Sequence, residues 1–110
     1  MTVAYLLILA VLVLLASYPA DETGNMPFLS IYGDRDGVLN RESYEKSRAF
    51  WPEGAEELVI PGGNHAQFGD YGPQRGDGAA SITQDEQQTQ TAQAILHWIQ
   101  TQISERGKAA

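Results

Sequence analysis

Three short apolar segments stand out along the chain, at residues 11–18, 28–32 and 58–60. None of them alternates regularly between apolar and polar positions, and each is followed by glycine or proline. Continuous runs of this kind are typical of strands that are buried on both faces of a parallel sheet. We therefore predict three strands, joined by polar and glycine-rich connections.

The first predicted helix covers residues 41–51. Asn40 is a candidate N-cap for it, because a short side-chain oxygen at that position accepts a bond from a free N–H of the first turn. Glu42 adds a negative charge in the first turn, where the helix dipole favours it. Pro52 then ends the helix.

The second predicted helix starts at a capping box formed by Thr83 and Glu86. We interpret the glutamine-rich segment 84–93 as its solvated face, Trp98 as a core residue and His97 as a surface residue. Residues 105–110 form a polar tail that is expected to fray. A stripe of apolar side chains is predicted to pack on the sheet, namely Ala92, Ile95, Leu96, Ile99 and Ile103.

This order of elements predicts an α/β fold. Strands that alternate with helices favour parallel pairing, here of about three strands with two main helices and a long glycine-rich loop at residues 61–78. Because the helices are so few, we expect one face of the sheet to lack a helix. We also expect the strand at residues 11–18 to form an unpaired edge.

The apolar N-terminal segment has two interpretations. Residues 3–16 are shorter than the roughly 20 residues of a membrane span but have the length of a signal-peptide core. No Lys or Arg precedes them, and Tyr18 occupies a cleavage-site position that requires a small residue. A strand at residues 11–18 after an atypical apolar start at residues 1–10 is therefore preferred, and with it a cytoplasmic location. Membrane attachment or export stays open.

Composition excludes several classes of function. The chain has 110 residues, 14 acidic and 7 basic side chains, and a formal net charge of -7. Such a chain forms one domain at most and offers no basic footprint for a nucleic acid. Cysteine is absent, which excludes disulfides, thiolate metal sites and a cysteine nucleophile. Asp70 and Asp77 lack the spacing of an EF-hand, so we predict no metal and no cofactor.

Candidate chemistry follows the second and third predicted strands. Asp34 and Asp36 come directly after residues 28–32, and His65 comes after residues 58–60 and two glycines. The carboxyl ends of parallel strands form the ligand crevice of an open α/β sheet. An imidazole there can shuttle a proton, and a carboxylate behind it fixes the tautomer and stabilises the imidazolium.

These segments, read as GDRDGV at 33–38, GGNHAQFGDYG at 62–72 and GDG at 76–78, resemble the C-terminal part of an α/β-hydrolase of the fold-5 type. The resemblance covers residues 11–104. It implies that the strands match the sixth, seventh and eighth of that fold, with the catalytic acid after the seventh and the histidine after the eighth. Asp36 then matches the acid and His65 the base of a Ser-His-Asp mechanism that hydrolyses esters or related acyl bonds.

One part of this family pattern is missing from the sequence. No Gly-x-Ser-x-Gly elbow occurs anywhere in it, so the nucleophile and its oxyanion-hole donors have no counterpart. Because such parts act as a unit, we expect the chain to be inactive alone. Two other interpretations stay open, namely a non-catalytic module that self-associates or binds through its strand edge, and a small membrane-attached protein held by residues 3–16.

Overall fold

The computed structural model describes residues 10–109, with side chains through residue 105. Three strands, β1 (Leu12–Leu15), β2 (Phe28–Gly33) and β3 (Glu56–Ile60), form one sheet. The main helices are α1 (Arg41–Ser47) and α2 (Gln84–Ala109), and two short 3-10 helices are η1 (Arg48–Phe50) and η2 (Ala66–Phe68). The strand order is β1-β2-β3 with both pairs parallel, which confirms the predicted α/β fold class.

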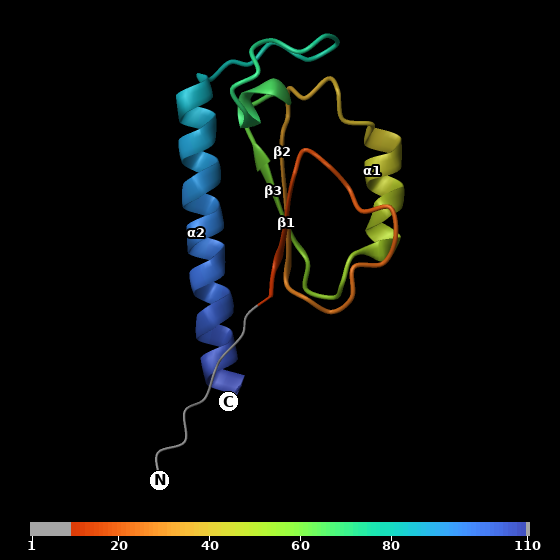
Figure 1. Ribbon diagram of the computed structural model, residues 1–110, viewed down its shortest axis with the longest axis vertical. Helices are drawn as coiled ribbons and strands as arrows, with labels where there is room; N and C mark the ends of the chain where they lie inside the picture. Colours follow the sequence, from red (N-terminus) through yellow and green to blue (C-terminus); the bar gives the residue numbers. More distant parts are fainter. Residues whose placement is uncertain (1–9, 110) are drawn as a thin grey trace.

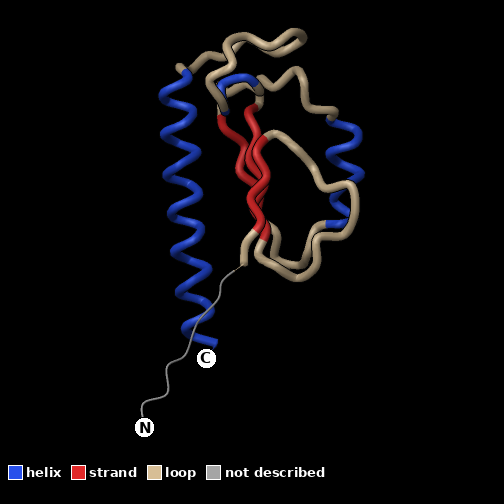
Figure 2. The backbone as a smooth tube through the Cα atoms, viewed as in Figure 1, coloured by secondary structure: helices blue, strands red, loops and turns tan. Residues whose placement is uncertain are grey.

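The elements form three layers. The sheet lies in the middle and is seen edge-on in Figure 1, with α2 along one face and α1 on the other. The expectation that one face lacks a helix is therefore wrong, because α1, in the connection from β2 to β3, lies on the face opposite α2. Figure 2 shows the long connection between β3 and α2 gathered at one end of the sheet, where β2 and β3 also end.

Alternate side chains of β2 supply both hydrophobic cores, as expected for a strand covered on two faces. Leu29 and Ile31 join Ile60 and Trp98 in the core under α2. On the other face, Tyr32 packs with Leu39 and Tyr44 of the α1 side. Every residue of β2 is buried, so this strand fixes the positions of the loops that follow it.

Polar contacts attach α1 to its face of the sheet. Buried Ser30 and Tyr44 share a hydrogen bond of 2.8 Å between their hydroxyl groups, and the Tyr44 hydroxyl also donates to the Glu57 carboxylate. Burial, and then the bond to Glu57, raise the pKa of Tyr44 well above its usual range. Arg48 bridges Glu57 and Glu45 at 2.7 Å each, which holds the end of α1 against β3.

The sequence locates the start of α1 well and its end less well. Asn40 is the N-cap, and its side chain accepts from the Ser43 N–H at 3.0 Å. The predicted helix over residues 41–51 is α-helical only through Ser47, because the last turn tightens into η1. The Trp51 indole donates to the Ser47 hydroxyl at 3.1 Å, and this bond anchors the chain where the helix ends.

The start of α2 is the predicted capping box. The Thr83 N–H donates to Glu86 at 3.1 Å, and the Glu86 N–H donates to Thr83 at 3.0 Å. The helix continues to Ala109, so residues 105–109 of the predicted polar tail are helical.

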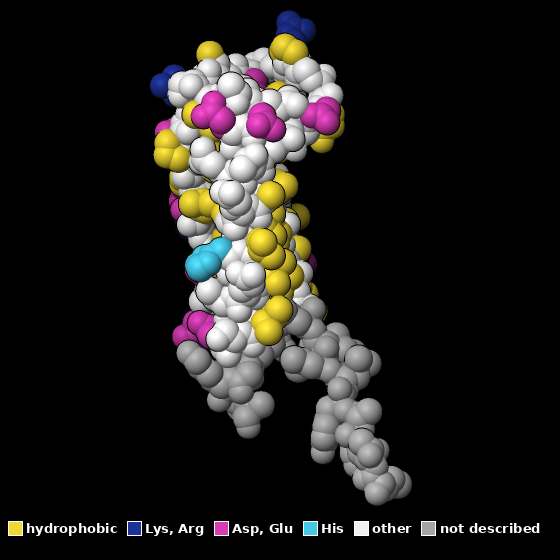
Figure 3. Space-filling view, turned by 90° about the vertical axis from the view of Figure 1, so that its left-hand side faces the viewer, with side chains coloured by type: hydrophobic (Ala, Val, Ile, Leu, Met, Phe, Trp, Pro, Cys, Tyr) yellow, Lys and Arg dark blue, Asp and Glu magenta, His cyan; other side chains and the backbone are white. Residues whose placement is uncertain are grey.

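The buried face of α2 differs from the predicted one. Gln87, Thr91 and Trp98 face the protein interior, whereas Leu96 and Ile103 are 59% and 48% exposed. Ile95 and Ile99 lie at the margin of the core, and Ala92 is exposed. Figure 3 shows hydrophobic side chains lined up along one side of the molecule. The face of α2 that packs inward therefore keeps Ile95 and Ile99 of the predicted stripe, but its buried residues are Gln87, Thr91 and Trp98.

The N-terminal strand is shorter than predicted. Residues 1–9 of the atypical start, and with them the first half of the apolar segment 3–16, lie outside the described residues. Within residues 11–18, only Leu12–Leu15 pair with β2, and Ala16 then leaves the strand with a positive φ of 51°. No helix in the described part of the chain is long and apolar enough to cross a membrane.

Candidate active site

The candidate site lies where β2 and β3 end. β2 ends at Gly33, three residues before Asp36, and β3 ends at Ile60, five residues before His65. Gly33 pairs with Ile60 in the parallel register, so the two loops leave the sheet side by side. A Cβ on Gly33 would lie 2.3 Å from the Gly63 carbonyl oxygen, and this close approach requires glycine.

The Asp36 carboxylate occupies a fully enclosed position. Its side chain is 0% exposed, and its Oδ1 accepts from the Val38 and Leu39 N–H groups at 2.8 Å each. The other oxygen, Oδ2, lies 2.8 Å from His65 Nδ1. Burial and three partners fix this carboxylate in one orientation, with one oxygen on its own loop and the other on the imidazole.

Asp34, the other carboxylate weighed from the sequence, has a different position. Its side chain is 49% exposed, and its Oδ1 accepts from the Gly62 N–H at 2.8 Å. It therefore ties the β2 loop to the β3 loop through the backbone. The geometry pairs His65 with Asp36 and leaves Asp34 outside that contact.

His65 is held so that one ring nitrogen is occupied and the other is free to act. Its side chain is 24% exposed, and Asp36 is the only hydrogen-bond partner of its ring among the described residues. A carboxylate at Nδ1 favours the tautomer with the proton on Nδ1. The Nε2 lone pair then remains available to take a proton from another group.

The backbone on both sides of His65 is held by two side chains that sequence reasoning missed as site residues. The buried amide of Gln87 accepts from the Asn64 N–H at 3.1 Å and donates to the Asn64 carbonyl at 2.8 Å. Asp77 accepts from the His65 N–H at 3.1 Å and from the Ala66 N–H at 2.8 Å. Gln87 lies within the segment interpreted as a solvated helix face, and its 0% exposure makes that interpretation wrong at this position.

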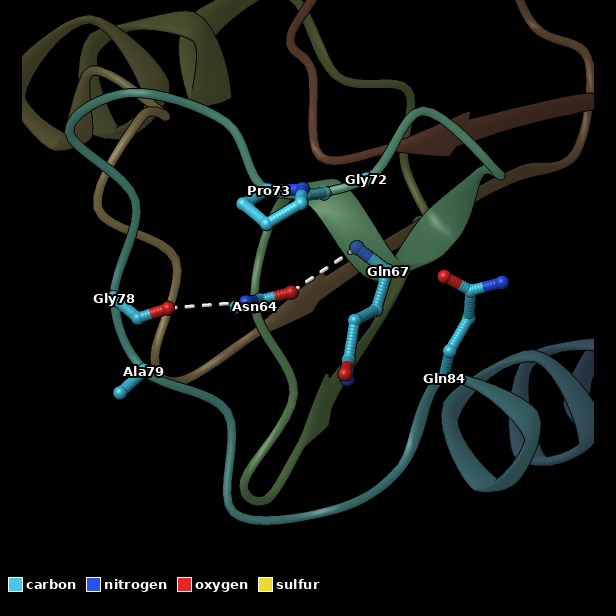
Figure 4. A pocket seen from close by; sticks show the side chains of 8 residues that line it. Asn64, Gln67, Gly72, Pro73, Gly78, Ala79 and Gln84 are labelled. Carbon is cyan, nitrogen blue, oxygen red and sulfur yellow. Dashed lines mark hydrogen bonds between the residues drawn. The ribbon is translucent and has the colours of Figure 1, made fainter.

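A pocket of about 330 Å³ lies behind the His65 loop. Figure 4 shows Asn64 and Gln67 on one side of it and Gln84 from the start of α2 on another. The side-chain amides of Asn64 and Gln84 already have hydrogen-bond partners. Asn64 donates to the Gly78 carbonyl at 3.0 Å, and Gln84 donates to Asp70 at 2.5 Å. Neither Asp36 nor His65 lines this pocket, so the pocket is separate from the Asp36–His65 pair.

Other chemistry-bearing side chains lie away from the pair. His97 is exposed on α2. Both oxygens of Asp77 accept backbone N–H groups, which does not suit a cation ligand, and no group of three His, Asp or Glu side chains within residues 10–109 could hold a metal ion. Ser30 and Ser47 are buried and bonded to Tyr44, and no serine of the described chain hydrogen-bonds to the His65 ring.

Comparison with known proteins identifies the family. Residues 7–89 match the alpha/beta hydrolase family. No curated protein and no solved structure matches the chain. The matched segment contains all three strands, α1 and both members of the Asp36–His65 pair. The family match and the parallel three-stranded sheet agree with the resemblance drawn from the sequence: the chain belongs to the alpha/beta hydrolase family.

Proposed function

We propose that this chain carries the acid and the base of a hydrolase that cleaves ester or related acyl bonds. The observation that supports the proposal is the 2.8 Å contact between a fully enclosed Asp36 carboxylate and His65 Nδ1. The two side chains come from loops at the carboxyl ends of adjacent parallel strands, which is where this family carries its acid and its histidine.

In this proposal each residue has a separate task. His65 Nε2 removes the proton of a hydroxyl nucleophile as that oxygen attacks the acyl carbon, and the same proton then passes to the leaving group. Water attacks the acyl intermediate in the second step with the same base. Asp36 remains ionised throughout, keeps the imidazole in position and stabilises its positive charge.

The nucleophile has to come from polypeptide other than these 110 residues. The sequence has no Gly-x-Ser-x-Gly elbow, and no described serine hydrogen-bonds to the imidazole ring. Without a nucleophile and an oxyanion hole, the remaining pair lacks the electrostatic stabilisation that usually contributes most to acyl transfer. We therefore propose that the chain alone is close to inactive towards ordinary esters.

The test uses an activated ester and a serine-directed probe on the purified chain. With p-nitrophenyl acetate, we expect slow hydrolysis by the free Nε2 that is lost in His65→Ala and reduced in Asp36→Asn. His97→Ala is the matched control, because it removes the other histidine from an exposed helix position and is expected to leave the rate unchanged. A fluorophosphonate probe is expected to label no serine.

Two outcomes contradict different parts of the proposal. Equal rates for the unmodified chain, His65→Ala and His97→Ala would show that His65 is not a reactive base, and the acid–base assignment would fall. A serine labelled in the unmodified chain but not in His65→Ala would keep the hydrolase and overturn the claim of inactivity alone.

A second candidate function is a binding module that self-associates through β1. β1 is an edge strand of the described sheet, and Leu15 is 38% exposed. Leu12 and Ala16 donate their N–H groups to the β2 side, so by alternation the Val13 N–H points to the open side. Val13→Pro removes that donor without removing a bond to β2. Sedimentation velocity would show a dimer that Val13→Pro converts to monomer, and a monomer at all concentrations would contradict this function.

A further inference from the structure

Asp77 lies in the long loop between η2 and α2, and its carboxylate gathers four backbone N–H groups. Oδ1 accepts from Gly37 and from His65 at 3.1 Å each, and from the Gly78 N–H at 2.9 Å. Oδ2 accepts from the Ala66 N–H at 2.8 Å. A carboxylate with four N–H partners is held much more firmly than a solvated surface aspartate, because hydrogen bonds to an ionised group are stronger than those between neutral groups.

These donors belong to both halves of the proposed acid–base pair. Gly37 follows Asp36 in the β2 loop, whereas His65 and Ala66 belong to the β3 loop. Asp77 therefore connects the segment that carries the acid with the segment that carries the base. Burial raises the pKa of Asp77, but the backbone N–H groups lower it by more, so that the net pKa lies below its usual value. The side chain is ionised at neutral pH.

The loop that carries Asp77 is also pressed against the Asp36 loop. A Cβ added to Gly37 would lie 2.4 Å from the Gly76 carbonyl oxygen, and one added to Gly78 would lie 1.9 Å from the Arg35 carbonyl oxygen. Such contacts are possible only between backbones without side chains at these positions. Asp70, in the same loop, is exposed and bonds only to the Gln84 side chain, so the arrangement is particular to Asp77.

We propose that Asp77 is a positioning residue, which fixes the His65 backbone relative to the Asp36 loop and so keeps Nδ1 on the Asp36 carboxylate. The inference rests on the proposed function, in which this contact makes His65 a base. Asp77 does not touch the imidazole ring; it acts on the ring through the main chain of His65 and Gly37.

The test follows the Nδ1 proton of His65 by NMR in the full chain. We expect a downfield Nδ1–H resonance that is lost or broadened in Asp77→Asn, whose single amide oxygen replaces only one of the two carboxylate oxygens, so that either the Ala66 or the His65 N–H faces an NH2 group. The amide that is left without an acceptor, that of Ala66 or that of His65, should then exchange with solvent at least about tenfold faster, as expected when a charge-assisted hydrogen bond is lost. Asp70→Asn is the matched control in the same loop and should change neither signal.

The outcomes separate this inference from the proposed function. If Asp36→Asn removes the resonance while Asp77→Asn keeps it, the acid–base pair stands and the positioning role is overturned. If Asp36→Asn leaves the resonance unchanged, the pair itself is wrong. Should Asp77→Asn not fold, amide exchange of the unmodified chain decides: similar protection of the Gly37, His65 and Ala66 amides supports one shared anchor, and unprotected exchange of His65 and Ala66 overturns it.

Discussion

The buried amide of Gln87 offers the clearest test of how α2 supports the site. Its side chain pairs with the Asn64 backbone as one peptide group pairs with another in a sheet, at 3.1 and 2.8 Å. It also accepts from the Gln67 amide at 2.8 Å. Gln87→Leu keeps a similar volume inside the protein but removes all three bonds.

The expected cost follows from the groups left without partners. The Asn64 N–H and carbonyl lose their only side-chain partner, and each part-buried backbone group left unsatisfied costs about 1 kcal/mol or more. Gln67 keeps its bond to the Ile82 carbonyl at 3.2 Å, so its loss is smaller. We expect Gln87→Leu to lower the free energy of unfolding by about 2 to 3 kcal/mol.

Urea unfolding followed by tryptophan fluorescence measures this change. Gln90→Leu is the control, because Gln90 is exposed on the same helix and a surface substitution there should stay within about 0.5 kcal/mol. Equal unfolding midpoints for Gln87→Leu and Gln90→Leu would refute the reasoning, since they would show that the Asn64 backbone finds other partners at no cost.

Three further predictions concern packing and charge. Gly78→Ala should lower the free energy of unfolding by about 2 kcal/mol, because its Cβ would meet the Arg35 carbonyl at 1.9 Å; an unchanged urea midpoint would contradict this. Trp98→Ala should cost about 3 to 5 kcal/mol, whereas Trp98→Phe should cost less, because it leaves a smaller cavity and the buried indole N–H has no partner among the described residues to lose; equal losses would contradict this. The lowered pKa of Asp77 stabilises the folded chain above about pH 4, the pKa of an unfolded aspartate, and this stabilisation is lost as the pH falls below that value. Asp77→Asn should therefore reduce the loss of unfolding free energy between neutral and acidic pH, and an unchanged loss would contradict the assignment.

Short-range sequence signals located most of the fold. The capping box at Thr83, the N-cap at Asn40 and the three apolar strands each depend on residues near one another in the chain, and all were found. The contact between Asp36 and His65 could also be expected, because adjacent parallel strands bring together the loops that follow them. The catalytic role of the pair remains a prediction.

Interactions between distant segments were harder to foresee. A glutamine in a polar helix segment is read as exposed unless its partner is known, and the partner of Gln87 is a backbone group in another loop. The sequence suggested Asp77 only as a possible metal ligand, whereas its partners include the N–H groups of Gly37 and His65, which lie 40 and 12 residues away in the chain. Gly76 and Gly78, which flank Asp77, were the available signal, because glycine is favoured where two backbones approach closely.

The contact of glycine backbones between the two loops has a consequence for how this site can change in evolution. Main chain meets main chain at Gly37 and Gly78, and the Asp77 carboxylate binds only backbone N–H groups. The outward side chains beside them, such as Arg35 and the 81% exposed Tyr71, take no part in that framework. Mutation can therefore alter the charge and shape of the surface beside these loops while Asp36 and His65 stay in place.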